Sequence, residues 1–245
     1  MANIKKEWFG EWFDSPFYHI LYKHRDHEEA RAFIDRLNIF FQWSTSDKIL
    51  DLACGKGRHS IYMNKKGLDV VGLDLSTENV KAAKAHENSR LYFYVHDMRE
   101  MFRSEEFDYI LNLFTSFGYF DTQRENEQVI CSGAKALKKG GRLLVDFLNP
   151  YKVIHKLVPC EEKKVDDINF KITKRMENGY ILKDIEFQHL GQKFNFQEKV
   201  KAIRRVEFLE YFKTAQLQVL HIFGDYDLNE YDCEVSDRLI FVVKK

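Results

Sequence analysis

The stretch Ile49–Ser60 (ILDLACGKGRHS) combines the residue types that hold a small charged molecule. An apolar run ends in Asp51, small residues follow, and a helix is expected to begin just after Gly57. Small residues let the backbone approach a ligand closely, and the first N–H groups of a helix can bind a carboxylate. Asp51 is suited to an ammonium group at the same place. A ligand that carries both groups is an amino acid, so the turn is predicted to bind one.

Two further carboxylates follow the next two apolar runs. Asp74 lies at the end of the second run, where a carboxylate can accept two hydrogen bonds from a ribose diol. Asp97 and Met98 come just after the third run, and they offer an acceptor for an exocyclic amine and an apolar side chain for a purine face. An amino acid, a ribose and an adenine together make S-adenosylmethionine, which is therefore the predicted ligand.

Strands are needed to bring these carboxylates together. Short apolar runs alternate along the chain with segments whose pattern predicts helices, near 60–66, 76–86 and 124–137. The runs are 48–54, 69–75, 91–95, 107–114 and 142–148. This alternation indicates an α/β fold with a parallel sheet covered on both faces, a Rossmann-like doubly wound architecture.

The rest of the chain has other patterns. The first 48 residues are rich in aromatic side chains and predict helices, one of them capped by Asp26. After Pro150, apolar and polar residues alternate around Asn178-Gly179, a strong hairpin signal, and Gly191, which predicts an antiparallel meander. A helix and two strands are expected after it.

These patterns predict a division of the chain into a core and an insert. The core comprises residues 1–159 and 204–245, with an N-terminal helical cap, and residues 160–203 form an inserted β lid over the acceptor. The insert is locally basic, but lysines that alternate along strands more often face solvent than nucleic acid. Nucleic acid is therefore an unfavoured, though not excluded, partner.

Composition limits the class of protein further. The chain has 245 residues, 44% of them hydrophobic, and its 38 basic residues balance 38 acidic ones, which disfavours both disorder and a polycation built for nucleic acid. Its four cysteines form no CxxC pair, so neither disulfides nor a metal site is expected. Without an apolar run of about 18 residues or an apolar N-terminal core, we expect a cytoplasmic protein that does not bind membranes.

Together these residues resemble the class I S-adenosylmethionine-dependent methyltransferases, over nearly the whole chain and most closely the small-molecule N-methyltransferases. The acidic residue of that family's glycine-rich motif matches Asp51, its glycines match Gly55 and Gly57, and Ala53 stands at its first glycine position. The resemblance implies a seven-stranded sheet of order 3-2-1-4-5-7-6 with strand 7 antiparallel. It also implies that residues 12–26 close over the cofactor and that residues 160–203 form the lid.

The resemblance assigns the remaining cofactor contacts. The ribose-binding acid falls on Asp74, the adenine-binding acid falls on Asp97, and the segment around the methyl group falls on Asn112, Leu113 and Phe114. The predicted cofactor-binding residues are Tyr22, Asp51, Ala53, Cys54, Gly55, Gly57, Arg58, Asp74, Leu75, Asp97, Met98, Leu113 and Phe114.

Methyl transfer from a sulfonium is an in-line displacement, so the protein mainly has to orient the acceptor and exclude water. If the acceptor is an amine, His59 and Tyr119 are candidate general bases, although the pattern requires neither. We expect a small-molecule acceptor in a pocket shaped by Phe114, Phe117 and Tyr119 with the insert above them.

Other functions remain open from the sequence alone. A nicotinamide-dependent oxidoreductase is disfavoured, because the third glycine of its GxGxxG motif would fall on Ser60. An RNA-directed methyltransferase and a non-catalytic S-adenosylmethionine-binding module are further alternatives. The acceptor, its reacting atom and the oligomeric state are not predicted.

Overall fold

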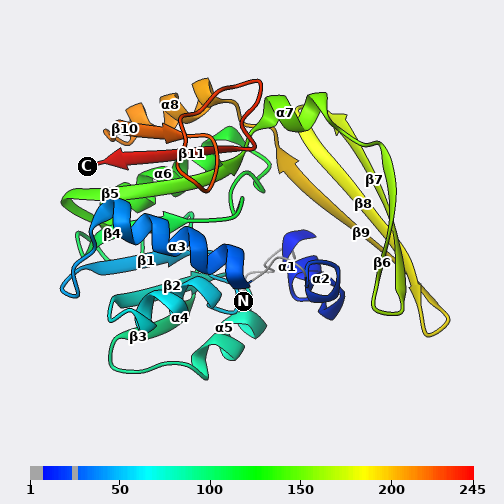
Figure 1. The fold of residues 1–245 in the computed structure, drawn as a ribbon, viewed down its shortest axis with the longest axis horizontal. Helices are drawn as coiled ribbons and strands as arrows, with labels where there is room; N and C mark the ends of the chain where they lie inside the picture. Colours follow the sequence, from blue (N-terminus) through cyan, green and yellow to red (C-terminus); the bar gives the residue numbers. More distant parts are fainter. Residues whose placement is uncertain (1–7, 24–26) are drawn as a thin grey trace.

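The computed structural model describes residues 8–23 and 27–245, and a seven-stranded sheet forms its centre (Figure 1). The order of its strands is β3-β2-β1-β4-β5-β11-β10, and only β11 runs antiparallel to both of its neighbours. The predicted Rossmann-like order is thereby confirmed. The strands are β1 (Lys48–Leu52), β2 (Asp69–Asp74), β3 (Leu91–Val95), β4 (Phe107–Asn112), β5 (Leu137–Leu148), β10 (Gln218–Phe223) and β11 (Arg238–Lys244).

Helices cover both faces of this sheet because its strands are apolar on both sides. Leu50 packs with α6 and α8 on one face, while Ile49 packs with α3, α4 and α5 on the other. The helices are α3 (His27–Phe41), α4 (Arg58–Lys65), α5 (Thr77–Lys84), α6 (Gln123–Ala136) and α8 (Arg205–Thr214). Within the described part of the chain, no helix is long and apolar enough to span a bilayer.

Local capping explains where several of these helices begin. The Ser76 side chain accepts a hydrogen bond from the Asn79 N–H at the start of α5, and Thr122 and Glu125 form a capping box on α6. The helix α7 (Pro150–His155) was not predicted, yet Asn149 caps it and proline occupies its first position. The predicted cap Asp26 lies outside the described residues.

The insert forms a separate antiparallel sheet, as predicted, and the structure gives it four strands in the order β6-β7-β8-β9. Its strands are β6 (Cys160–Val165), β7 (Ile168–Glu177), β8 (Tyr180–His189) and β9 (Gln192–Lys201). Asn178 and Gly179 both have positive φ values, 51° and 80°, which is the geometry of the expected two-residue hairpin turn.

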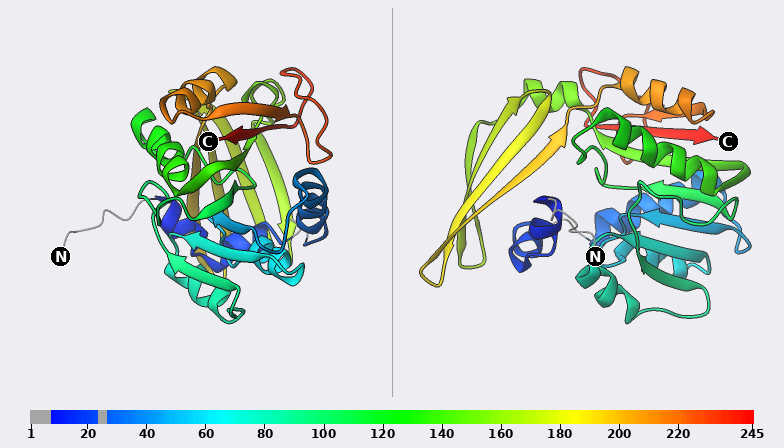
Figure 2. Two further views of the ribbon diagram at one scale, coloured as in Figure 1. Left: turned by 90° about the vertical axis from the view of Figure 1, so that its left-hand side faces the viewer. Right: turned by 180° about the vertical axis from the view of Figure 1, so that it is seen from behind.

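The helices α1 (Trp8–Phe13) and α2 (Pro16–Leu21) lie between the insert and the central sheet (Figures 1 and 2). Trp12 and Leu21 are buried against the apolar face of the insert, beside Phe170 and Ile185. This face therefore packs on the N-terminal helices.

Gly57 shows how closely the turn after β1 packs on the sheet. Its φ is +81°, and a Cβ placed there would lie 2.7 Å from the Phe93 ring, which is fully buried on β3. Gly179 has nearly the same φ, +80°, but no atom lies within 4 Å of the corresponding position. The two glycines therefore differ in available space and share one backbone conformation.

We expect Gly57→Ala to destabilise the protein more than Gly179→Ala does. Both variants place a side chain in the left-handed region, which costs on the order of 1 kcal/mol, and Gly57→Ala adds roughly 1–3 kcal/mol of overpacking against Phe93. Urea denaturation of the two variants measures the difference. Equal losses of stability would show that Phe93 does not restrict Gly57.

Candidate active site

A cavity of about 490 Å³ opens at the carboxyl ends of β1, β2 and β4. The strand order reverses between β1 and β4, which is where doubly wound sheets bind ligands. The N-terminal segment closes the opposite side of the cavity with Phe13, Tyr18, His19, Tyr22 and Lys23. The cavity thus lies between the central sheet and the N-terminal helices.

Asp51 brings a carboxylate into the interior at the end of β1. The residue is 1% exposed and accepts a hydrogen bond of 2.5 Å from the Ser60 hydroxyl at the start of α4. Burial raises the pKa of Asp51 to about 7, although the bond from Ser60 acts in the opposite direction. The carboxyl group is therefore poised to ionise when a cation such as an ammonium group arrives.

The turn after Asp51 is shaped for close approach by a ligand. Ala53 and Gly55 both have left-handed φ values, 59° and 57°, and a Cβ on Gly55 would meet nothing within 4 Å. Cys54 is buried there, and burial raises the pKa of its thiol, which argues against a nucleophilic role. Open space above backbone N–H groups is what a bound carboxylate needs.

Asp74 connects this turn to the next strand. Its carboxylate accepts hydrogen bonds from the backbone N–H groups of Gly55, at 2.8 Å, and Ser76, at 2.9 Å. Burial raises the pKa of Asp74 despite these bonds. The Ser76 hydroxyl also donates to Asp14, which follows α1, so the N-terminal segment contacts the core at this point.

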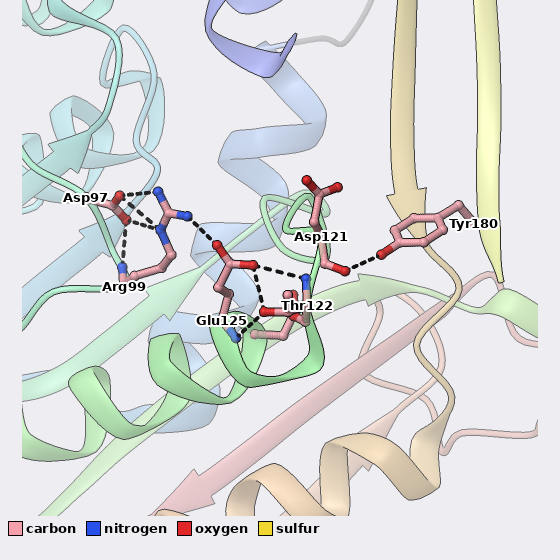
Figure 3. A network of polar contacts seen from close by, with 7 residues as sticks. Asp97, Arg99, Asp121, Thr122, Glu125 and Tyr180 are labelled. Carbon is pink, nitrogen blue, oxygen red and sulfur yellow. Dashed lines mark hydrogen bonds and ion pairs between the residues drawn. The ribbon is translucent and has the colours of Figure 1, made fainter. Parts of the chain in front are cut away.

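Asp97 follows β3 and belongs to a network of polar contacts (Figure 3). Arg99 forms an ion pair with Asp97 at 2.6 Å and another with Glu125 of α6 at 2.7 Å. Burial alone would raise the pKa of Asp97, but the hydrogen bonds and charge of Arg99 lower it below its ordinary value. Asp97 is therefore a fixed, ionised acceptor at neutral pH.

The loop after β4 forms another wall, and its backbone is held in an uncommon conformation. Phe114 and Thr115 have φ values of 56° and 60°, and the buried Asp146 accepts a hydrogen bond of 2.7 Å from the Phe114 N–H. Arg238 binds both Asp146 and the Thr115 hydroxyl. Such strain persists only where the surrounding structure stabilises it, and it is common at functional sites.

Both candidate bases contact this loop. His59 is 6% exposed and stacks on Phe114, with 5.0 Å between the ring centroids. The Tyr119 hydroxyl donates a hydrogen bond of 2.6 Å to the Thr115 carbonyl oxygen. Both residues line the cavity, but His59 packs its ring on Phe114 and Tyr119 donates its hydroxyl proton to Thr115.

The cavity gathers nearly all the predicted cofactor-binding residues. Tyr22, Asp51, Ala53, Cys54, Gly55, Arg58, Asp74, Leu75, Asp97, Met98, Leu113 and Phe114 line it. Gly57 does not, because it packs against Phe93 below the turn. Asn112 is 1% exposed and donates to the carbonyl oxygens of Leu52 and Ser116, so it supports the wall from behind.

Two expectations about the acceptor pocket were wrong. Phe117 is fully buried in the core beside Phe147 and Phe208 and does not line the cavity. No residue of the insert strands is among the described residues that line it either. The N-terminal helices occupy that position, because they cover the apolar face of the insert that would otherwise face the cavity.

Sequence reasoning missed His19 and Lys56 as lining residues. Burial and the nearby charge of Lys56 lower the pKa of His19, so its imidazole is neutral at pH 7. No sequence pattern places α2 opposite the turn at Gly55, and only the imprecise expectation that residues 12–26 close the site covered His19. Asn79 on α5 and Phe120 were missed in the same way.

Comparison of this sequence with known proteins finds similarity to methyltransferases. Residues 49–141 match the family model described as a methyltransferase domain. The chain is 26% identical over 208 residues to YqeM of Bacillus subtilis, a protein named as a methyltransferase, covering 81% of this chain and 84% of that one.

Two solved structures share the fold over most of the chain. An S-adenosylmethionine-dependent methyltransferase from Clostridium acetobutylicum matches with a TM-score of 0.79 and 20% identity, covering 93% of this chain and 96% of that one. The amino pentose methyltransferase CalS10 from Micromonospora echinaspora, with S-adenosylmethionine bound, matches with a TM-score of 0.73 and 18% identity, covering 94% and 97%.

We expect Asp51→Asn to stabilise the ligand-free protein at pH 8 and to have little effect at pH 4. The pKa of Asp51 rises from 3.8 to about 7 on folding, so the wild-type carboxylate opposes folding increasingly as pH rises from about 4 to 7. The difference between these pKa values sets an upper limit of roughly 4 kcal/mol on the gain in stability. The asparagine side chain can still accept the hydrogen bond from Ser60. Denaturation at the two pH values measures the effect; a variant no more stable than wild type at pH 8 contradicts it.

Proposed function

We propose that this chain, as a class I S-adenosylmethionine-dependent methyltransferase, transfers the methyl group of S-adenosylmethionine to a nucleophilic atom of a small molecule. One observation carries the proposal. Three carboxylates at the carboxyl ends of neighbouring parallel strands, Asp51, Asp74 and Asp97, line a single cavity that the N-terminal helices close. The cavity volume, about 490 Å³, falls within the range of small-molecule sites.

The residues present fit the cofactor. Asp51 is a buried carboxylate that gains a counter-charge from an ammonium group, and the space above Gly55 suits the carboxylate of the same amino acid. Asp74 and Asp97 would accept hydrogen bonds from the ribose and from the adenine amine. When bound, the cofactor supplies an electrophilic methyl group on a sulfonium sulfur.

The acceptor side of the cavity is aromatic. Phe13 lies 5.4 Å from Tyr119 between ring centroids, and Tyr18 lies 5.0 Å from Phe13. Aromatic walls exclude water and hold an acceptor in line with the methyl group. An amine on a sugar-sized molecule is the first acceptor class to test, since CalS10 is an amino pentose methyltransferase.

An amine acceptor must lose a proton before or during attack. His19 lines the cavity, and its lowered pKa leaves the imidazole able to accept a proton at pH 7. We therefore propose His19 as the general base ahead of His59 and Tyr119. Because His19 lies on α2, the helix that closes the cavity would also place the base beside the acceptor.

The lid is proposed to consist of two layers. The helices α1 and α2 face the cavity, and the insert supports them from behind (Figure 2). Glu198 of β9 accepts hydrogen bonds from the Trp12 indole, at 2.7 Å, and from the Tyr22 hydroxyl, at 2.6 Å. The insert thereby acts on the cofactor through Tyr22.

We expect Glu198→Ala to weaken binding of S-adenosylhomocysteine by about tenfold, although Glu198 is not a lining residue. The cause is loss of the bonds that hold α1 and Tyr22 in place. Glu161→Ala is the matched control, because Glu161 pairs with Lys174 within the same sheet at 2.7 Å. Calorimetry measures both affinities, and an unchanged affinity in Glu198→Ala contradicts the two-layer lid.

The function itself is tested by binding and then by transfer. Calorimetry is expected to show binding of S-adenosylhomocysteine and not of NAD, and Asp74→Asn should weaken it by about tenfold. S-adenosylmethionine with a labelled methyl group is then offered with amino sugars, amino acids, phenols and total RNA, and label is expected on a small amine. Binding of NAD alone, or salt-sensitive labelling of RNA alone, would overturn the proposal.

A further inference from the structure

The Asp97 carboxylate is almost fully engaged by one residue. The backbone N–H of Arg99 donates to Oδ1 at 2.9 Å, Nε lies 3.1 and 3.0 Å from Oδ1 and Oδ2, and Nη2 donates to Oδ2 at 2.6 Å. A carboxylate has about four acceptor positions. The three N–H groups make four contacts because the single Nε proton is shared between the two oxygens, so roughly one acceptor position remains for a ligand.

Arg99 is itself fixed from several directions (Figure 3). Its Nη1 donates to Glu125 at 2.7 Å, and its guanidinium lies 4.7 Å from the centroid of the Phe120 ring, which lines the cavity. The Ser132 hydroxyl donates to its carbonyl oxygen at 2.8 Å. A planar guanidinium held in this way sets the plane of the carboxylate it binds.

The same network continues to the insert. Glu125 accepts bonds from the N–H and hydroxyl of Thr122, at 3.0 and 2.7 Å. The carbonyl oxygen of the adjacent Asp121 accepts a bond of 2.8 Å from the Tyr180 hydroxyl on β8 (Figure 3). Arg99 is therefore connected through Glu125, Thr122 and Asp121 to the insert as well as to the core.

We propose that Arg99 is the positioning residue that makes this cavity select a six-amino purine, by leaving Asp97 one correctly oriented acceptor position. The inference rests on the proposed function, in which Asp97 receives the adenine amine. A 6-oxo purine would present its carbonyl oxygen to the same ionised carboxylate and would be repelled. Without Arg99 the carboxylate can rotate, and the distinction between the two purines is lost.

The test compares S-adenosylhomocysteine with its 6-oxo analogue, S-inosylhomocysteine, by calorimetry. Wild type is expected to prefer the amino form by about tenfold or more. In Arg99→Met the ratio of the two dissociation constants should fall to about threefold or less, and Arg99→Lys should lose most of the preference because lysine lacks the bidentate fork. Glu125→Gln, which loosens Arg99 without touching Asp97, should reduce the ratio partially.

Arg103→Met is the matched control. Arg103 pairs with Glu106 at 2.8 Å and lies 4.9 Å from the centroid of the Phe102 ring. Like Arg99, it thus contacts a glutamate and an aromatic ring in the same loop, but its ion pair is with Glu106 and not with Asp97. In Arg103→Met, the ratio of the dissociation constants for the two ligands should equal that of wild type.

Each other result has a separate meaning. Absence of binding to both ligands in wild type overturns the proposed function. An equal loss of both affinities in Arg99→Met, or an unchanged ratio, overturns the role of Arg99 while leaving the function intact. If Arg99→Met does not fold, Arg99→Lys and Glu125→Gln decide by the same ratio.

Discussion

The burial of the Asp51 carboxylate governs the rest of the site. At the end of a central parallel strand, this group is removed from water, which raises its pKa to about 7 and makes its ionisation costly in the ligand-free protein. That cost is offset when a cation arrives, so the same burial that opposes folding favours an ammonium group. Ser60 and the left-handed turn at Ala53 and Gly55 hold this arrangement in place.

Three layers of structure lie around that carboxylate: the central sheet, the N-terminal helices and the insert. The central sheet supplies the acidic side chains, the N-terminal helices close the cavity, and the insert holds those helices through Glu198 and a shared apolar core. Asp14 and Ser76 connect the helices to the core beside Asp74. The helices are therefore attached to the insert on one side and to the core on the other.

Local patterns predicted the sheet, because runs such as 49–52 and 69–74 are largely apolar and each carries an aspartate, Asp51 or Asp74, in its last two positions. The insert was equally predictable, since Asn178-Gly179 between two runs of alternating residues strongly favours a two-residue hairpin turn. The position of α1 and α2 was not, because it depends on side-chain contacts between residues far apart in sequence, such as Trp12 and Glu198. Phe117 was misplaced for a related reason: an aromatic residue in a loop gives no sign of which way it points. The link from Arg99 to Glu125 also needs the helix α6 in place.

The central claim, that Asp51 holds the amino-acid half of the cofactor, is tested most directly by proton release on binding. Calorimetry at pH 6.5 in two buffers of different ionisation enthalpy measures the protons exchanged. Because the pKa of Asp51 is about 7 in the free protein, binding of S-adenosylhomocysteine should release a large fraction of one proton. Adenosine, which lacks the ammonium group, should release none, and Asp51→Asn should abolish the release. Equal proton exchange for the two ligands, or none for S-adenosylhomocysteine, would contradict the account.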